Sequence, residues 1–252
     1  MERIDRLLVE QGLVPSRARA QKLITEGRVK VKVKGEWEAP KKTGQKYPYA
    51  VDIHIEFNDD DRFASRGGVK LAGALAFAGI DVSGLNVLDV GQSTGGFTDC
   101  VLQAGAGKVV GVEVGHDQLV PSLREDKRVV CLEGINARDL PHDLLLQHID
   151  GYGFDLAVMD VSFISQTKIL PSLAPVLREG GHLLSLVKPQ FEVGPSGLGK
   201  GGIVRNEKLY PKVQKDISAL CESLGLKVKA WFDSPIKGGD GNREFFIWAV
   251  KA

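Results

Sequence analysis

The stretch from Leu85 to Asp99, with the sequence LNVLDVGQSTGGFTD, constrains the fold of this chain more than any other. A short apolar run ends in a carboxylate, three glycines follow within six positions, and an amphipathic segment comes next. This order predicts a buried parallel strand, a tight turn and the start of a helix. Glycine lets a ligand approach the backbone closely, and amides at a helix N-terminus bind polar groups, so we expect a nucleotide-like cofactor here. The glycine spacing fits the dinucleotide fingerprint poorly, which leaves a plain strand-to-helix turn as the alternative.

Further apolar runs follow the same plan. Separated by helical segments, they predict strands at residues 109–114, 129–132, 155–160 and 182–189. This alternation predicts an α/β fold with a doubly wound, Rossmann-like parallel sheet. After a helix at about 206–224, two more strands are expected at 227–233 and 244–250. Their connection is too short for a crossover helix, so these two should pair antiparallel.

Several polar or glycine positions lie where predicted strands end, namely Gly91, Glu113, Asp160 and Lys188. Ligands of such sheets bind beyond the carboxyl ends of the strands, so these residues should share one rim. Glu113 ends the strand that follows the glycine turn, the usual place of an acid that binds ribose hydroxyls. An ordinary surface acid is the alternative at this position.

The front of the chain is basic, although the whole chain carries a net charge of only +1. Residues 1–50 hold twelve lysines and arginines against six acids. The pattern predicts helices at 3–13 and 17–24, the second capped by Ser16, and a strand at 29–33. Cations gathered on adjacent elements favour contacts with nucleic-acid phosphates over a merely solvated surface. The expected RNA contacts are Arg3, Arg6, Arg17, Arg19, Lys22, Arg28, Lys30 and Arg66.

The order of residues in this front segment resembles the S4-like RNA-binding domain. The matching motif is Arg3-x-Asp5-x-Leu7-Leu8, followed by Ser16-Arg17-x-x-Ala20-x-x-Leu23-Ile24-x-x-Gly27-x-Val29. The first helix is expected to carry Ile4, Leu7, Leu8 and Leu13 on one apolar face at helical spacing, with Gly12 as its stop signal. The chain departs from the family at Lys34-Gly35, where Asn-Gly is usual.

An acidic connector of low apolar content follows, with Asp52, Glu56, Asp59, Asp60 and Asp61. We therefore expect a domain boundary near residues 58–64, which divides the chain into an S4-like domain, 1–60, and a second domain, 61–252. The cysteines match no metal or redox spacing and are expected to be small buried residues: Cys100, Cys131 and Cys221. The charged N-terminus and the lack of an apolar run near about 20 residues predict a cytoplasmic protein outside the membrane. Nothing in the sequence indicates an oligomeric state.

Residues 192–202 are rich in glycine and are expected to form a mobile lid over a substrate. Gly194 to Lys200 spells G-x-x-x-x-G-K, the start of a phosphate-binding P-loop. Gly201 stands where that loop needs a hydroxyl for magnesium, and the preceding strand ends too early. The lid is therefore favoured over a nucleotide-hydrolysing site.

Motifs distributed over nearly the whole chain resemble the TlyA family of ribosomal RNA methyltransferases, which are related to the FtsJ-like enzymes. In order they are Ser65-Arg66-Gly67-Gly68-x-Lys70-Leu71, Asp89-Val90-Gly91-x-Ser93-Thr94-Gly95-Gly96-Phe97-Thr98-Asp99, Asp160-Val161-Ser162-Phe163-Ile164-Ser165, Lys188-Pro189-Gln190-Phe191-Glu192 and Gly241-Asn242-x-Glu244-Phe245. The chain departs from the family at Gln92, where a small residue is more common. This side chain is expected to narrow the cofactor turn.

The resemblance implies a class I methyltransferase that uses S-adenosylmethionine and no metal to methylate ribose 2′-hydroxyls of ribosomal RNA. It implies a catalytic tetrad of Lys70, Asp160, Lys188 and Glu244. Methylation needs the hydroxyl proton removed, and a lysine can accept it only when its ammonium form is destabilised by desolvation or a nearby cation. Lys188 at a strand end, with Lys70 expected nearby, offers both. The carboxylates of Asp160 and Glu244 act in the opposite direction and favour the ammonium form, so the residues alone leave this balance open. Cofactor contacts are expected from Asp89, Gly91, Ser93, Thr94, Gly95, Gly96, Phe97, Glu113, Asn136 and Asp160.

Two alternatives remain beside this enzyme. The family has also been called haemolysins, which implies a membrane-damaging protein, but the sequence offers no spanning segment or membrane-surface helix for that role. A non-catalytic RNA-binding factor with a retained cofactor pocket is the other. The chain ends shortly after its last strand, as in the shorter members of the family, and this resemblance implies a cytidine of large-subunit RNA as the substrate.

Overall fold

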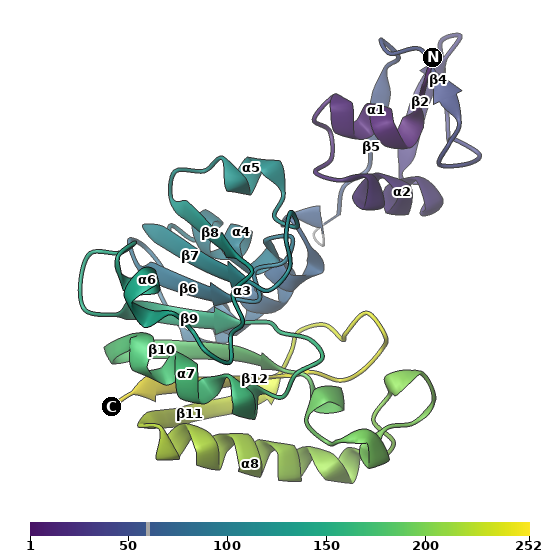
Figure 1. Ribbon diagram of the computed structural model, residues 1–252. Helices are drawn as coiled ribbons and strands as arrows, with labels where there is room; N and C mark the ends of the chain where they lie inside the picture. Colours follow the sequence, from purple (N-terminus) through teal and green to yellow (C-terminus); the bar gives the residue numbers. More distant parts are fainter. Residues whose placement is uncertain (59–60) are drawn as a thin grey trace.

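The computed structural model describes residues 1–58 and 61–252 (Figure 1). The expected boundary between the two domains adjoins residues 59 and 60, and Asp59 and Asp60 of the acidic connector lie outside the described residues. The division into 1–60 and 61–252 stays a prediction.

The N-terminal part packs two helices against a small sheet. The helices are α1 (Ile4–Glu10) and α2 (Arg17–Thr25). The three-stranded sheet has the order β3-β2-β5, with β2 at Val29–Val33, β3 at Glu36–Glu38 and β5 at Ile53–Ile55. A separate pair joins β1 (Glu2–Arg3) to β4 (Lys46–Tyr47). The core between these elements contains Ile4, Leu7, Leu8, Ala20, Leu23 and Val29.

Local sequence explains most of these elements. The Ser16 hydroxyl accepts a hydrogen bond from the Arg19 amide and caps α2 as predicted. Lys34 and Gly35 both have positive φ angles, so the pair makes the tight β2–β3 hairpin despite its departure from Asn-Gly. The prediction for Leu13 was wrong. Helix α1 ends at Glu10, three residues earlier than predicted, so Leu13 is 38% exposed and Val14 is buried in its place.

The second part is built on a seven-stranded sheet with the order β11-β12-β10-β9-β6-β7-β8. Its strands are β6 (Asn86–Val90), β7 (Lys108–Glu113), β8 (Val129–Glu133), β9 (Phe154–Met159), β10 (Leu177–Val187), β11 (Leu226–Asp233) and β12 (Phe245–Lys251). Strands β6 to β10 pair in parallel, and β12 pairs antiparallel with both β10 and β11. The predicted Rossmann-like sheet and its antiparallel final pair are confirmed.

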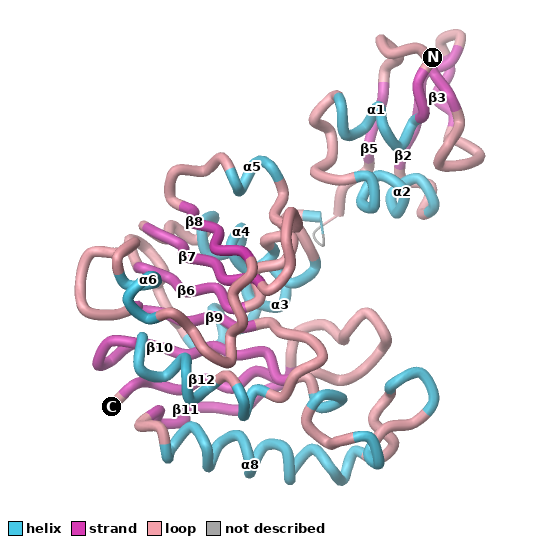
Figure 2. Tube along the Cα trace, in the orientation of Figure 1, coloured by secondary structure: helices cyan, strands magenta, loops and turns pink. Residues whose placement is uncertain are grey.

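Helices cover both faces of this sheet (Figures 1 and 2). One face packs against α3 (Arg66–Ala78), α4 (Gly96–Gln103) and α5 (Pro121–Arg124). The other face packs against α6 (His142–Leu146), α7 (Leu170–Leu173) and α8 (Tyr210–Ser223). Strand β10 begins at Leu177, whereas the sequence pattern predicted a start at residue 182. The prediction missed the first residues because the stretch Arg178–Gly181 is polar or glycine and breaks the apolar run.

Candidate active site

The turn after β6 has the geometry that the glycines predicted. Gly91 has a φ of +85°, and a Cβ at this position would lie 2.5 Å from the backbone oxygen of Asp160. Gly95 has a φ of +98° and precedes the first residue of α4. Both positions therefore need glycine, because a side chain would be strained and would collide with its neighbours. The strand, turn and helix bring the open amides of α4 to the rim of the sheet.

Asp89 and Gln92 stabilise this turn through hydrogen bonds to the Thr98 hydroxyl. Asp89 is fully buried and accepts a hydrogen bond of 2.7 Å from the Thr98 hydroxyl, and burial raises the pKa of its carboxyl to about 7. The Gln92 amide donates to the same hydroxyl and packs over Gly111 of β7. Gln92 is thus 2% exposed and lies against the sheet, where Gly111 leaves room for it. The expectation that Gln92 narrows the cofactor turn stays a prediction.

A cavity of about 600 Å³ lies at the carboxyl ends of the central strands. Five of the residues expected to bind the cofactor line it, namely Gly91, Ser93, Glu113, Asn136 and Asp160. The Glu113 carboxylate accepts hydrogen bonds from the amides of Ser93 and Gly115, which fixes it at the cavity wall. Sequence reasoning missed other lining residues, among them Gln118, Ile135 and Phe163.

Phe163 is the most conspicuous of the missed residues. It is 90% exposed, has a φ of +63° and lies with its ring 5.1 Å from that of Phe191. An exposed aromatic residue in the left-handed region is unusual for a non-glycine position. The sequence held one indication that Phe163 lies at the cavity, namely its position directly after Asp160-Val161-Ser162.

A smaller cavity of about 150 Å³ adjoins the first. The two share four lining residues: Gly91, Ser93, Asp160 and Ser162. The smaller one adds Ser65, Gly67, Gln92, Thr94, Gly96, Phe97 and Lys188. The combined cleft therefore runs from the acid at the end of β7 to the lysine at the end of β10. Asp89 and Gly95 are buried and line neither of these two cavities, so their contact with a cofactor stays a prediction.

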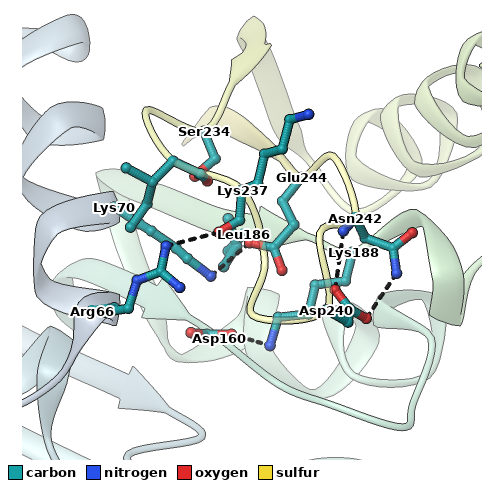
Figure 3. A network of polar contacts seen from close by, with 12 residues as sticks. Arg66, Lys70, Asp160, Leu186, Lys188, Ser234, Lys237, Asp240, Asn242 and Glu244 are labelled. Carbon is teal, nitrogen blue, oxygen red and sulfur yellow. Dashed lines mark hydrogen bonds and ion pairs between the residues drawn. The ribbon is translucent and has the colours of Figure 1, made fainter. Parts of the chain in front are cut away.

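The four residues of the expected tetrad meet at this end of the cleft as two ion pairs (Figure 3). Lys70 Nζ, from α3, lies 2.6 Å from Glu244 Oε2, at the start of β12. Lys188 Nζ, after β10, lies 2.5 Å from Asp160 Oδ1, after β9, and 3.0 Å from the hydroxyl of Ser162. Residues from four separate elements are thus brought to one place by the sheet order.

The tetrad is partly withdrawn from water. Lys70 and Glu244 are buried, and the side chain of Lys188 is 12% exposed. Burial raises the pKa of the Glu244 carboxyl, and the ammonium groups of Lys70 and Lys188 counteract this rise in part. Charges in such a site act on one another more strongly than in water. The arrangement is suited to moving a proton on or off a bound hydroxyl group.

The residues expected to contact RNA differ in how closely they pair with acidic residues of this chain. Arg3 and Arg17 both bind the buried Asp5 carboxylate, and hydrogen bonding to Arg3 holds the pKa of that carboxyl well below its usual range. Arg19 and Arg28 both pair with Asp61. Such pairs follow from the tertiary fold, because Asp61 lies far from both arginines in sequence. These four cations are committed to the protein itself.

The remaining basic residues are held more loosely. Arg6 lies 3.9 Å from Glu2, and Lys22 lies 3.7 Å from Glu26. Lys30 pairs with the exposed Glu56 at 2.5 Å. Arg66 opens α3 and donates a long hydrogen bond to the backbone oxygen of Lys237 above the tetrad (Figure 3). Of the expected RNA contacts, Arg6 and Lys22 are therefore the most available to a phosphate.

Three further expectations concern cysteines, metals and membranes. Cys100 and Cys221 are buried as expected, which raises the pKa of each thiol to about 12, whereas Cys131 is half-buried. Among residues 1–58 and 61–252, no three acid, cysteine or histidine side chains are grouped so that they could hold a metal ion. No helix within the same residues has the length and apolar character needed to cross a membrane.

Comparisons with known proteins agree with this fold. The family model of the FtsJ-like methyltransferases matches residues 63–251, and that of the S4 domain matches residues 2–31. The 16S/23S rRNA (cytidine-2′-O)-methyltransferase TlyA of Mycobacterium tuberculosis is 39% identical over 98% of this chain and 88% of its own length. Hemolysin A of Brachyspira hyodysenteriae is 38% identical over 96% of this chain and 97% of its own. A solved structure named "Putative hemolysin from Streptococcus thermophilus" has a TM-score of 0.75 at 39% identity and covers 100% of this chain and 88% of its own.

Proposed function

Because the chain belongs to the FtsJ-like methyltransferases and combines that domain with an S4 domain in the TlyA manner, we propose that it methylates a cytidine ribose 2′-hydroxyl of ribosomal RNA. The observation that carries the proposal is the double ion pair of Lys70 with Glu244 and Lys188 with Asp160 at the end of the cleft. The name of the M. tuberculosis relative covers RNA of both ribosomal subunits. Of the two we propose the large-subunit RNA, encountered in the cytoplasm.

The cleft suits S-adenosylmethionine as the methyl donor. Glu113 stands at one end, where a carboxylate can accept hydrogen bonds from ribose hydroxyls. At Gly91 the space that a Cβ would need is taken by the backbone of Asp160, so glycine lets the turn after β6 pack directly against the chain that follows β9. Asn136 and Ser93 offer further polar groups along the wall. When bound, S-adenosylmethionine supplies an electrophilic methyl group on its sulfonium sulfur.

The tetrad then acts on the ribose. Once its ammonium group has released a proton to solvent, Lys188 accepts the 2′-hydroxyl proton as the oxygen takes the methyl group. Asp160, 2.5 Å away, stabilises the ammonium that forms again. Lys70 and Glu244 form the second pair and orient the ribose through its oxygen atoms. Holding the reacting groups in line contributes most, since well-oriented reactions reach effective molarities of about 10⁵ M or more.

Calorimetry tests the cofactor. The purified protein should bind S-adenosylmethionine and should not bind NAD, because the glycine spacing and Glu113 frame a cleft without the dinucleotide fingerprint. Replacement of Glu113 by alanine should weaken S-adenosylmethionine binding, while replacement of the exposed Glu179 near the start of β10 should leave it unchanged. Tight binding of NAD by the wild-type protein would contradict the assignment.

Charge reversal tests the N-terminal RNA surface. The double variant Arg6→Glu/Lys22→Glu should weaken RNA binding and flatten its dependence on salt, because phosphate contacts release counterions. S-adenosylmethionine affinity should not change. Arg17→Gln serves as the comparison, since this arginine binds buried Asp5 and its loss should lower the stability of the N-terminal part. Unchanged RNA affinity and salt slope in the double variant would show that these cations form a solvated surface only.

A further inference from the structure

The glycine-rich segment does not lie open, although the sequence predicted a mobile lid. Residues 197–205 fold back on themselves: the Gly199 amide donates to the Ile203 oxygen at 2.7 Å, and the Arg205 amide donates to the Gly197 oxygen at 2.9 Å. Leu198 and Val204 form an antiparallel bridge between the two arms. Val204 is buried, whereas Lys200 and Gly201 at the tip are exposed. The arm that contains Val204 is therefore held against the rest of the protein, while the tip of the segment is exposed.

The anchor of that arm is the side chain of Asn242. This residue is only 2% exposed, although its neighbours Gly241 and Arg243 are exposed. Its Oδ1 atom accepts a hydrogen bond of 3.1 Å from the Val204 amide. Its Nδ2 atom donates to the Gly202 oxygen at 3.2 Å. The same atom donates to Asp240 Oδ2 at 2.8 Å (Figure 3). One amide group thus ties the glycine-rich segment to the loop that joins β11 to β12.

The same loop holds Glu244 of the tetrad. The Gly238 amide donates to the Asn242 backbone oxygen at 2.9 Å, and the Ser234 amide donates to the Glu244 backbone oxygen at 2.9 Å. A Cβ at Gly238 would lie 2.6 Å from Glu244 Oε1, so the loop backbone closes directly on the carboxylate. A shift of this loop must therefore move Glu244, which is paired with Lys70.

We propose that Asn242 is a positioning residue for methyl transfer: it ties the glycine-rich segment to the β11–β12 loop and thereby keeps Glu244 aligned with Lys70. This inference rests on the proposed function. An amide suits the place because it both donates and accepts, as the Val204 amide and the Gly202 oxygen together require. An aspartate at 242 would instead place a second carboxylate against Asp240, which already accepts from the Nδ2 atom at 2.8 Å.

The test uses Asn242→Asp, Asp240→Asn and the double variant Asp240→Asn/Asn242→Asp in the full-length chain. Asn242→Asp should lower kcat by about 10- to 100-fold through misplacement of Glu244, with little change in KM for RNA or in S-adenosylmethionine affinity. It should also speed amide hydrogen exchange at residues 199–204. The double variant should regain only the part of kcat that is lost to repulsion between the two carboxylates, because the amide introduced at position 240 can donate to the carboxylate at 242, whereas the Gly202 oxygen still lacks its donor. Asn206→Ala, which removes only a cap on the Lys208 amide, is the control and should behave like the wild type.

The outcomes separate this inference from the proposed function. If Asn242→Asp keeps the wild-type kcat and the wild-type exchange at residues 199–204, Asn242 holds nothing in place and the inference is wrong. A loss of kcat in Asn242→Asp without faster exchange at residues 199–204 also overturns it. If the wild-type chain itself transfers no methyl group, the proposed function fails, and unchanged exchange in Asn242→Asp would then still decide against the anchor.

Discussion

Replacement of Lys188 by alanine is expected to lower the rate of methyl transfer by about 10²–10⁴-fold, the usual cost of removing a general base. The amine lies between Asp160 and Ser162 at the end of the cleft, so its loss leaves the walls around Glu113 and Asn136 intact. Affinities for S-adenosylmethionine and RNA should therefore stay near the wild-type values. Single-turnover transfer of a labelled methyl group, with binding measured separately, resolves the two effects.

Two companion variants sharpen this prediction. Lys188→Arg should fail almost as completely, because a guanidinium stays protonated and cannot accept a proton. Lys212→Ala removes an exposed lysine of α8 that also pairs with an aspartate, and should leave turnover unchanged. Near-normal turnover in Lys188→Arg would mean that Lys188 only supplies positive charge. Loss of S-adenosylmethionine binding in Lys188→Ala would place it in the cofactor site instead.

Replacement of Gly91 by alanine is expected to weaken S-adenosylmethionine binding by at least about tenfold, which corresponds to about 1.4 kcal/mol. The backbone there has a φ of +85°, a conformation that costs a non-glycine residue about 1–3 kcal/mol. The new methyl group would also lie 2.5 Å from the Asp160 oxygen, so the turn must move away from Asp160. Calorimetric titration of the variant measures the effect.

Gly84→Ala is the matched control for this backbone effect. Gly84 has a φ of +74°, but nothing lies within 4 Å of the position of its Cβ, and it precedes β6, whereas the cleft lies at the other end of that strand. Both variants should lower the free energy of unfolding, whereas only Gly91→Ala should lose cofactor affinity. Equal S-adenosylmethionine affinity in the two variants would show that the turn at Gly91 does not hold the cofactor.

The central sheet and its rim follow from the sequence, because each parallel strand is an apolar run with a polar or glycine residue at its end. Gly91, Glu113, Asp160 and Lys188 are predictable for this reason: the strand ends of a parallel sheet lie on one side. The pairing of Lys70 with Glu244 is different. It joins residues 174 positions apart, and only the resemblance to a family, not a local pattern, brought the two together.

Other features of the site could not be read from the sequence. The roles of Arg19 and Arg28 depend on Asp61, whose position is set by how the chain leaves the N-terminal part. A stretch rich in cations looks like an RNA surface whether or not its charges are already paired. Asn242 stands in a motif of the family, but its contacts with Val204 and Gly202 were not predictable, since they depend on how two loops meet. Tertiary contacts of this kind leave no periodic signal.

The most direct test of the proposed function is a map of 2′-O-methyl groups in ribosomal RNA from cells with and without this protein. We expect one cytidine of the large-subunit RNA to lose its methyl group when the protein is absent. Wild-type protein should restore that group, and the Lys188→Ala variant should not. Identical methylation maps in the presence and absence of the protein would contradict the account.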